Sequence, residues 1–213
     1  MAIISRSQQL LLSISILILT GCGTSTINIE GSYPSPLVNK LPFTLGVYYD
    51  DSFKSHSFTE INERNGKDQY IINSGAAQVS LFNTVLPAAF EEFVLIDDIN
   101  NMAAYPNVDL VFVPVIEAFQ LGLPEKTQLD VYEIWIKYNM RLSQANGDYI
   151  ADWVMTAYGK SPSDTSGSSK EAVNNAANIA LRDLAATFSL GFGSIPGVRE
   201  WLEENSKLPS QGL

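Results

Sequence analysis

The sequence has very few of the side chains that most often bind metals or act as nucleophiles. Among its 213 residues there is one cysteine, Cys22, and one histidine, His56. A single cysteine excludes an intramolecular disulfide, so the fold must be stabilised by its core. A transition-metal site would have to consist mostly of carboxylates, and we interpret Asp50-Asp51 and Asp97-Asp98 as solvated turns. We therefore expect no metal and no cofactor.

Basic residues are also scarce. Lysine and arginine total 13 against 23 aspartate and glutamate residues, which gives a net charge of -10. Binding of nucleic acid requires a basic surface, so we expect no nucleic-acid partner. An anionic bilayer would repel such a chain, so charge cannot hold it on a membrane.

The chain has one predominantly apolar run, from Leu10 to Leu19, after a short segment that contains Arg6. A basic start, an apolar core of about ten residues and an end of small residues are typical of a secretory signal peptide. The run is too short for a membrane-spanning helix, which needs roughly 20 apolar residues. We predict that residues 1–21 are a signal peptide.

The signal ends in Leu19-Thr20-Gly21-Cys22, which resembles the lipobox of bacterial lipoproteins. The resemblance implies cleavage between Gly21 and Cys22, transfer of diacylglycerol to the Cys22 sulfur, and acylation of the new amino terminus, typically by palmitate. The bilayer would then be a partner through these acyl chains, because two or more chains anchor a protein firmly. In enterobacteria-like lipoproteins Gly23, in place of aspartate, implies export to the periplasmic face of the outer membrane. The alternative is an unprocessed core cysteine that follows a glycine.

The composition changes after the signal. Residues 22–41 are rich in Gly, Ser, Thr, Asn and Pro, which favours a flexible, lipidated tether. We predict one periplasmic domain at 42–205, long enough to bury a substantial core. The tail at 206–213 is predicted to be disordered.

The first part of this domain contains four short predicted strands and one helix. The strand-forming segments are 43–49, 69–72, 93–96 and 109–119. A helix is predicted at 75–90, capped by Asn73 or Ser74, and the polar segment 50–68 is predicted to be a loop. The strand at 109–119 has no polar face and should be buried, while Pro114 within it indicates an edge position or a bulge.

The clearest pattern is a hairpin formed by residues 129–142 and 149–159. Asn146-Gly147 is the favoured type I′ turn, which places Ala145 opposite Asp148. In this register one face has only apolar pairs, namely Leu142–Ala151, Met140–Trp153, Tyr138–Met155 and Ile136–Ala157. The other face pairs Arg141 with Asp152, Lys137 with Thr156 and Trp135 with Tyr158. A slip by one residue would turn both apolar sets to the wrong side, so the pattern predicts this register.

A long helix is predicted after the hairpin. Ser168 and Glu171 form a capping box at its start, and small apolar residues at helical spacing continue to a stop at Gly191. Such residues favour close packing on a sheet. Pro196 begins a short final helix.

Motifs for catalysis are weak. Gly191, Gly193 and Gly197 follow a helix and do not join a strand to one, so they do not form a phosphate-binding loop. No G-x-S-x-G elbow is present. A hydroxyl–His–carboxylate triad that uses His56 is the remaining alternative. We predict no enzyme and no catalytic residue. Trp135 and Tyr158 lie on the non-core face of the hairpin, which a helix or a partner must cover, and they are the candidate partner surface.

The element order over 43–201, together with the lipobox cysteine, resembles small α/β domains of bacterial envelope lipoproteins. These are the curli-secretion lipoproteins, the penicillin-binding-protein activator lipoproteins and the TolB amino-terminal domain. The resemblance implies an α+β fold in which a mostly antiparallel sheet of about five strands is packed by two main helices. It also implies a non-catalytic adaptor or assembly role through contacts with another envelope protein. The alternative is a periplasmic ligand-binding module or minor hydrolase with a site in the 50–68 loop.

Overall fold

The computed structural model describes residues 23–62, 69–127, 129–164 and 167–205. Its larger sheet has five strands in the order β5-β2-β6-β7-β8. These are β2 (Leu41–Val47), β5 (Phe90–Leu95), β6 (Leu110–Gly122), β7 (Val131–Gln144) and β8 (Tyr149–Pro162). The long strands β6, β7 and β8 pair antiparallel, whereas β2 pairs parallel with both β5 and β6. The predicted α+β class and the five strands are confirmed, and the parallel pairs of β2 are an addition to the expected antiparallel sheet.

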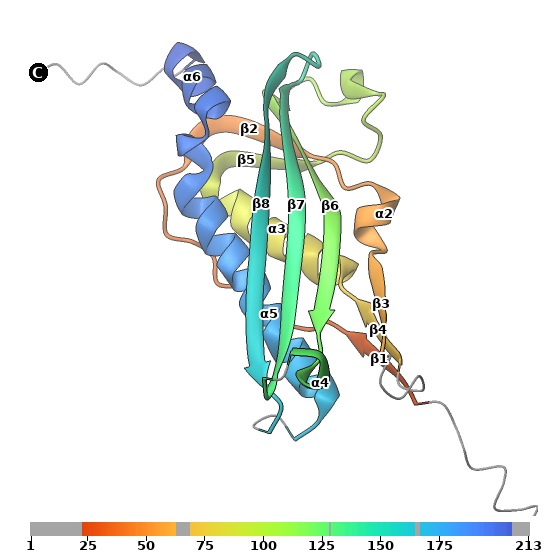
Figure 1. Cartoon of the computed structure of the whole chain (residues 1–213). Coiled ribbons are helices and arrows are strands. Elements are labelled where there is room, and N and C mark those ends of the chain that lie inside the picture. The colour runs from red at the N-terminus through yellow and green to blue at the C-terminus, as the bar shows by residue number, and fades with distance from the viewer. Residues whose placement is uncertain (1–22, 63–68, 128, 165–166, 206–213) are drawn as a thin grey trace, which may run out of the picture.

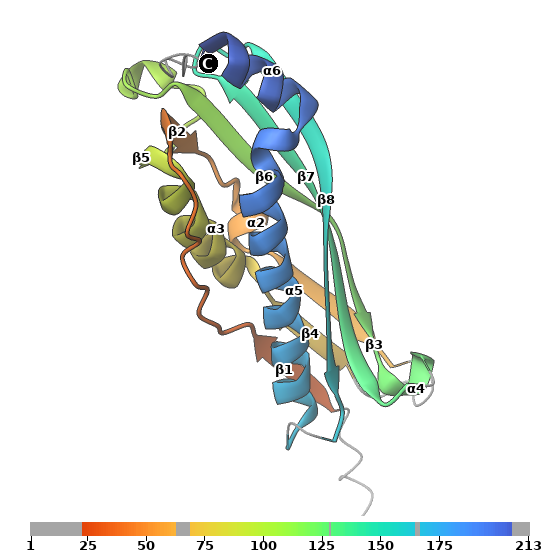
Figure 2. The same cartoon turned by 90° about the vertical axis from the view of Figure 1, so that its left-hand side faces the viewer.

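Two long helices, α3 (Gly75–Ala89) and α5 (Ser169–Gly191), lie on one face of this sheet (Figures 1 and 2). The shorter helical segments are α2 (Asp51–Lys54), η2 (Met102–Ala104), α4 (Pro124–Thr127), η3 (Phe192–Ser194) and α6 (Pro196–Asn205). The rings of Phe82 in α3, Phe112 in β6 and Phe188 in α5 meet with centroids 5.6 to 6.2 Å apart. The core therefore joins both helices to the middle of the sheet.

Helix α5 begins and packs as its sequence predicts. The Ser168 hydroxyl accepts a hydrogen bond from the backbone N–H of Glu171 at 3.2 Å, as expected for a capping box. Alanines and leucines between Ala172 and Leu184 form the buried stripe. At Gly159 of β8, an added Cβ would lie 2.1 Å from the carbonyl oxygen of Ala176. Strand and helix therefore approach to a distance that only a glycine allows.

The register of the hairpin β7–β8 is confirmed for the pairs predicted on both faces. Leu142 faces Ala151 and Trp135 faces Tyr158, with the intervening pairs in step. The predicted turn, however, is wrong. The N–H of Gly147 donates to the carbonyl of Gln144 at 2.9 Å, and Gly147 has a φ of +93°. The loop therefore has three residues, 145 to 147, and ends in a left-handed glycine.

A β-bulge restores the predicted register beyond this longer loop. Ser143 faces Tyr149, but Leu142 faces Ala151, so Ile150 is an extra residue on β8. The extra loop residue and the extra strand residue compensate each other. The apolar pairs, and not the turn type, determine which residues face each other.

A second sheet, in the order β1-β4-β3, contains residues that we expected to be a tether or a loop. Its strands are β1 (Thr24–Asn28), β3 (Ser57–Ile61) and β4 (Gln69–Asn73). β1 pairs parallel with β4, and Ile27 in β1 is 4% exposed. The predicted loop at 50–68 contains α2 and β3, so that prediction is wrong for 51–61, while β4 confirms the strand expected at 69–72.

The residues after β1 continue along helix α5. The N–H of Glu30 donates to Asn174 Oδ1 at 2.9 Å, and Asn178 Nδ2 donates to the Glu30 carbonyl at 2.7 Å. Ile29 and Tyr33 are buried in the main core. A flexible tether over 22–41 is therefore wrong for residues 24–33, and the folded domain begins well before residue 42.

Pro114 lies in a central strand but at a locally open edge. β2 pairs with β6 only from Leu110 to Phe112, so the stretch of β6 that holds Pro114 has no β2 partner beside it. The expected edge position of Pro114 is confirmed.

Candidate interaction surface

Most of the face of β6, β7 and β8 turned away from α3 and α5 is open to solvent, and it is toward the viewer in Figure 1. Near the hairpin turn this face is partly covered, because Val111 of β6 is buried against Ile96 and Val108. We call this surface the outer face. The side chains at alternate positions of β7 from Ile134 to Leu142 are buried in the core, so the intervening side chains belong to the outer face. The same alternation places Asp152, Val154, Thr156, Tyr158 and Lys160 of β8 there. Figure 2 shows the long helices α3 and α5 on one side of the sheet, opposite to this face.

The structure brings together the two aromatic residues proposed from sequence. Trp135 and Tyr158 are cross-strand neighbours, Trp135 is half-buried, and Tyr158 is 45% exposed. The Tyr158 hydroxyl donates to Glu133 Oε1 at 2.5 Å. This hydrogen bond to a carboxylate raises the pKa of Tyr158. Tyr158 therefore stays neutral and is held in place on the outer face.

An apolar patch with one buried polar atom lies in the middle of the outer face. Asn139 is paired across the sheet with Val115 of β6 and Val154 of β8. Val154 is 53% exposed, whereas the Asn139 Oδ1 atom is buried and has no hydrogen-bond partner among the described residues. A buried acceptor without a donor costs roughly 1–3 kcal/mol. The outer face thus contains a buried acceptor whose desolvation no described donor offsets.

The charged residues of the outer face are mostly paired within it. Lys137 Nζ lies 2.6 Å from Glu117 Oε2, and Arg141 Nε lies 3.9 Å from Asp152 Oδ2. Exposed pairs of this kind contribute little to stability. Each pair adds no net charge to this face, so contacts here depend mainly on shape and apolar area.

A hollow of about 440 Å³ lies on the outer face near the hairpin turn. Its apolar lining includes Val111, Val113 and Val115 of β6 with Tyr48 and Tyr149, and its charged residues are Asp50, Arg141 and Asp152. We did not predict this hollow, because the apolar run of β6 was interpreted as a strand buried on both faces. Val113 and Val115 are in fact only half-buried. The absence of a polar face in the β6 sequence is the signal that could have indicated apolar side chains on both faces of this strand.

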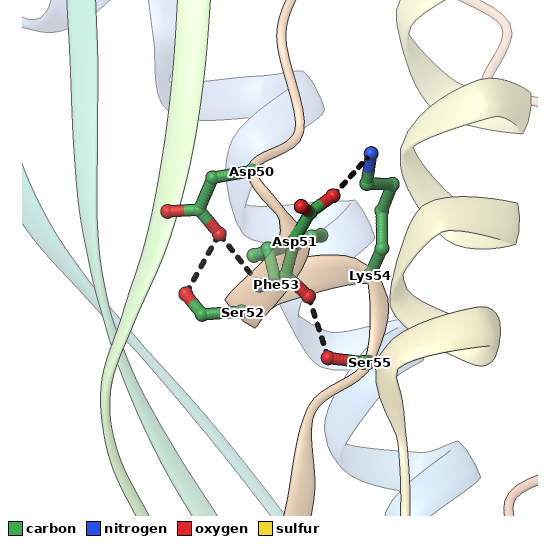
Figure 3. A network of polar contacts seen from close by, with 6 residues as sticks. All are labelled: Asp50, Asp51, Ser52, Phe53, Lys54 and Ser55. Atoms are coloured by element: carbon green, nitrogen blue, oxygen red, sulfur yellow. Dashed lines mark hydrogen bonds and ion pairs between the residues drawn. The ribbon is translucent and has the colours of Figure 1, made fainter.

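Asp50, at the rim of this hollow, caps the short helix α2 (Figure 3). Its Oδ1 accepts hydrogen bonds from Ser52 Oγ and from the N–H of Phe53, both at 2.7 Å. These two hydrogen bonds lower the pKa of Asp50, and the bond from Ser52 has the larger effect. Asp51 pairs instead with Lys54 at 2.9 Å. The acidic pair is thus engaged in local turn structure, and no cluster of three or more metal-ligating side chains occurs among the described residues.

His56 belongs to a buried hydrogen-bond chain. Its Nδ1 lies 2.8 Å from Ser74 Oγ, which also accepts from Gln78 Nε2 at 2.8 Å, and Tyr138 Oη donates to Gln78 Oε1 at 2.6 Å. Ser74 is only 1% exposed, and its side chain does not cap α3 as predicted. The His56 ring packs on Phe119, and burial lowers its pKa. The serine next to the histidine therefore has no access to a substrate.

Cys22 and the cleavage position after Gly21 lie outside the described residues. Within the described ranges, no helix is both long and apolar enough to cross a membrane.

No protein-family model matches the sequence, and no curated protein matches it. Among solved structures, the fold is similar to that of protein XCC0632 from Xanthomonas campestris, of the DUF330 family, with a TM-score of 0.53 and 13% identity. That similarity covers 84% of this chain and 98% of the other. A minor lipoprotein from Acinetobacter baumannii is similar with a TM-score of 0.40 and 12% identity, over 71% of this chain and 92% of the other. The chain thus shares the fold of the Xanthomonas protein, and at this identity the similarity extends to the fold alone.

Proposed function

We propose that the chain is a lipid-anchored envelope protein that acts as a non-catalytic adaptor or assembly factor, held at the periplasmic face of the outer membrane. The lipobox-like residues 19–22 support the anchor, and Gly23 supports the outer-membrane location. Because the chain carries a net charge of -10, acyl chains are the attachment that its composition favours.

The observation that carries the proposed binding role is the uncovered outer face. It presents an exposed tyrosine beside a tryptophan at one end and a hollow with an aliphatic floor at the other. Aromatic residues that are half-buried in the free protein are common anchors of protein–protein contacts. These features support a protein partner that lies across β6, β7 and β8.

The absence of a catalytic role is part of the proposal, and it rests on the environment of His56. The hydroxyl nearest to the histidine is that of Ser74, which is buried, and it is already hydrogen-bonded to Gln78. A nucleophile must reach its substrate, so this pair suits a structural link better than a triad.

A second candidate is the binding of a small apolar ligand in the hollow. Its volume of about 440 Å³ falls within the range of ligand pockets, which is roughly 300–1,000 Å³. This candidate retains the expected site near residue 50. It predicts that Tyr149→Ala, rather than Tyr158→Ala, removes function.

The test is photo-crosslinking of the full chain in its own cells, with a photoreactive amino acid at position 158. We expect a discrete crosslinked partner, and a matched probe at Leu190, which is 81% exposed on α5, should not capture it. Tyr158→Ala and Trp135→Ala should weaken capture from a probe at Val154 by about tenfold or more, while His56→Ala leaves it unchanged. Equal capture from positions 158 and 190, or loss of capture in a folded His56→Ala variant, would refute the proposal.

A further inference from the structure

We propose that strand β8 pairs with β8 of a second copy of the chain, so that two sheets become one across a two-fold axis at Thr156. β8 is the last strand of the five-stranded sheet and has 14 residues. Figure 2 shows this edge running beside α5 with no further strand beyond it. An edge strand exposes backbone N–H and C=O groups that another strand can pair with.

The two edges of the sheet differ in how they are protected. The opposite edge, β5, has six residues and carries Glu91 and Glu92, both exposed. Two copies of β5 would bring these acidic side chains together, which disfavours pairing. Between the bulge at Ile150 and Pro162, β8 has neither a proline nor a bulge. Only β8 therefore combines length with an unprotected edge among the described strands of this sheet.

The outer-face side chains of β8 complement themselves in one antiparallel register. When Thr156 faces the partner's Thr156, Asp152 faces the partner's Lys160 and Val154 faces the partner's Tyr158. All of these side chains are exposed. Within the described residues, Lys160 forms no ion pair that would have to break before it pairs with the partner's Asp152. Opposite charges, Thr–Thr pairs and aromatic pairs with β-branched residues are the favourable cross-strand combinations. A two-fold axis repeats each unlike pair, so two ion pairs form per dimer.

The inner-face side chains of β8 pair large with small in the same register. Trp153 faces the partner's Gly159, and Met155 faces the partner's Ala157. Small residues therefore face large ones, and no two large inner-face side chains oppose each other in this register. A hollow of about 270 Å³ lies at this edge, between residues 153–156 and the end of α5, and its lining includes Phe188 and Gly191. The register that matches charge thus also keeps the large inner-face side chains of the two copies apart.

Disulfide trapping tests the register in the full chain. In an antiparallel pair, directly opposite Cα atoms are about 4.5–5.5 Å apart, within the range for a disulfide. The Thr156→Cys variant is made in the full chain, which keeps Cys22, and it is tested in membranes. After mild oxidation we expect a disulfide-linked dimer of about twice the monomer mass. Val154→Cys alone should give little, whereas a mixture of Val154→Cys and Tyr158→Cys chains should crosslink. Monomer only, or an equal yield from Thr156→Cys and Val154→Cys, would overturn the proposal.

Charge exchange tests the partner. Lys160→Glu and Asp152→Lys, each in the Thr156→Cys background, should reduce the dimer at least several-fold, while a mixture of the two chains should restore it as a heterodimer. Thermal melts that match wild type would establish that both variants are folded. Failure of the mixture to restore the crosslink would contradict the pairing. A disulfide between position 156 and a different protein would also contradict self-pairing and would favour the adaptor contact. Loss of the Tyr158 photo-crosslink alone would contradict the adaptor proposal but not the dimer.

Discussion

A single missing side chain allows strand β8 and helix α5 to pack backbone against backbone. A Cβ at Gly159 would lie 2.1 Å from the Ala176 carbonyl oxygen and 2.5 Å from the Ala180 nitrogen. Both are main-chain atoms inside a helix, so neither can move aside as a flexible side chain would. The position of α5 on the sheet therefore depends on this glycine.

We expect Gly159→Ala to lower the free energy of unfolding by about 1–3 kcal/mol, because the methyl group forces the helix and the strand apart. The matched control is Gly193→Ala, where an added Cβ would meet no atom within 4 Å. Urea unfolding of both variants measures the difference. Equal midpoints for the two variants would show that α5 does not approach β8 this closely.

At the scale of elements, the end of the hairpin depends on one backbone conformation. Gly147 has a φ of +93°, and no atom lies within 4 Å of a Cβ built on it. A side chain there has space but an unfavourable φ, so any cost comes from the backbone alone.

We expect Gly147→Val to reduce stability by roughly 1–3 kcal/mol, since a β-branched residue strongly disfavours positive φ. Arg141→Ala, which removes the exposed pair with Asp152, should cost no more than about 1 kcal/mol. Denaturant melts of the full chain compare the two. An unchanged midpoint for the valine variant would be inconsistent with the three-residue loop.

The sequence predicts those elements whose residues constrain one another locally. The hairpin register followed from seven side-chain pairs, and α5 followed from its capping box and its small-residue stripe. The turn was assigned wrongly because Asn146-Gly147 suits both a two-residue and a three-residue loop, and the bulge at Ile150 hid the difference. The cross-strand side-chain pairs therefore determine the register of the hairpin more strongly than the turn motif does.

Elements that depend on distant partners were missed. β1 has the sequence Thr-Ser-Thr-Ile-Asn, and its place as a strand is set by β4, about 45 residues later. The parallel pairs of β2 likewise join segments that no local pattern relates. For the candidate site, the pair Trp135 and Tyr158 was predictable from register, whereas the hollow requires Tyr48 and β6 to meet the hairpin in space.

At the scale of the whole molecule, the proposed anchor and the hollow near the hairpin turn lie toward different ends. β1, which begins two residues after Cys22, is at the lower end in Figure 1, and the turn between β7 and β8 is at the upper end. A strand of 14 residues spans roughly 45 Å. The hollow near the turn would therefore be held well away from a bilayer that receives the acyl chains.

We expect Cys22→Ala to release the protein from membranes, because an acidic domain without acyl chains has little other attachment. Sedimentation of membranes before and after a salt wash measures this, and Ser35→Ala, at an exposed position, should behave as wild type. An alanine variant that stayed with the membranes after the wash would mean that another part of the chain holds the bilayer.

The position of β1 also determines how the molecule would carry a mechanical load. A pull between the anchor and a partner near the hairpin turn would enter the domain at Thr24, with Gly23 as the sole spacer after Cys22. β1 lies parallel to β4 with five residue pairs in register. Tension applied at the start of such a strand, along its own direction, shears its hydrogen bonds together instead of opening them one at a time. β1, whose composition is that of a linker, would thus be the first part of the fold to resist that force.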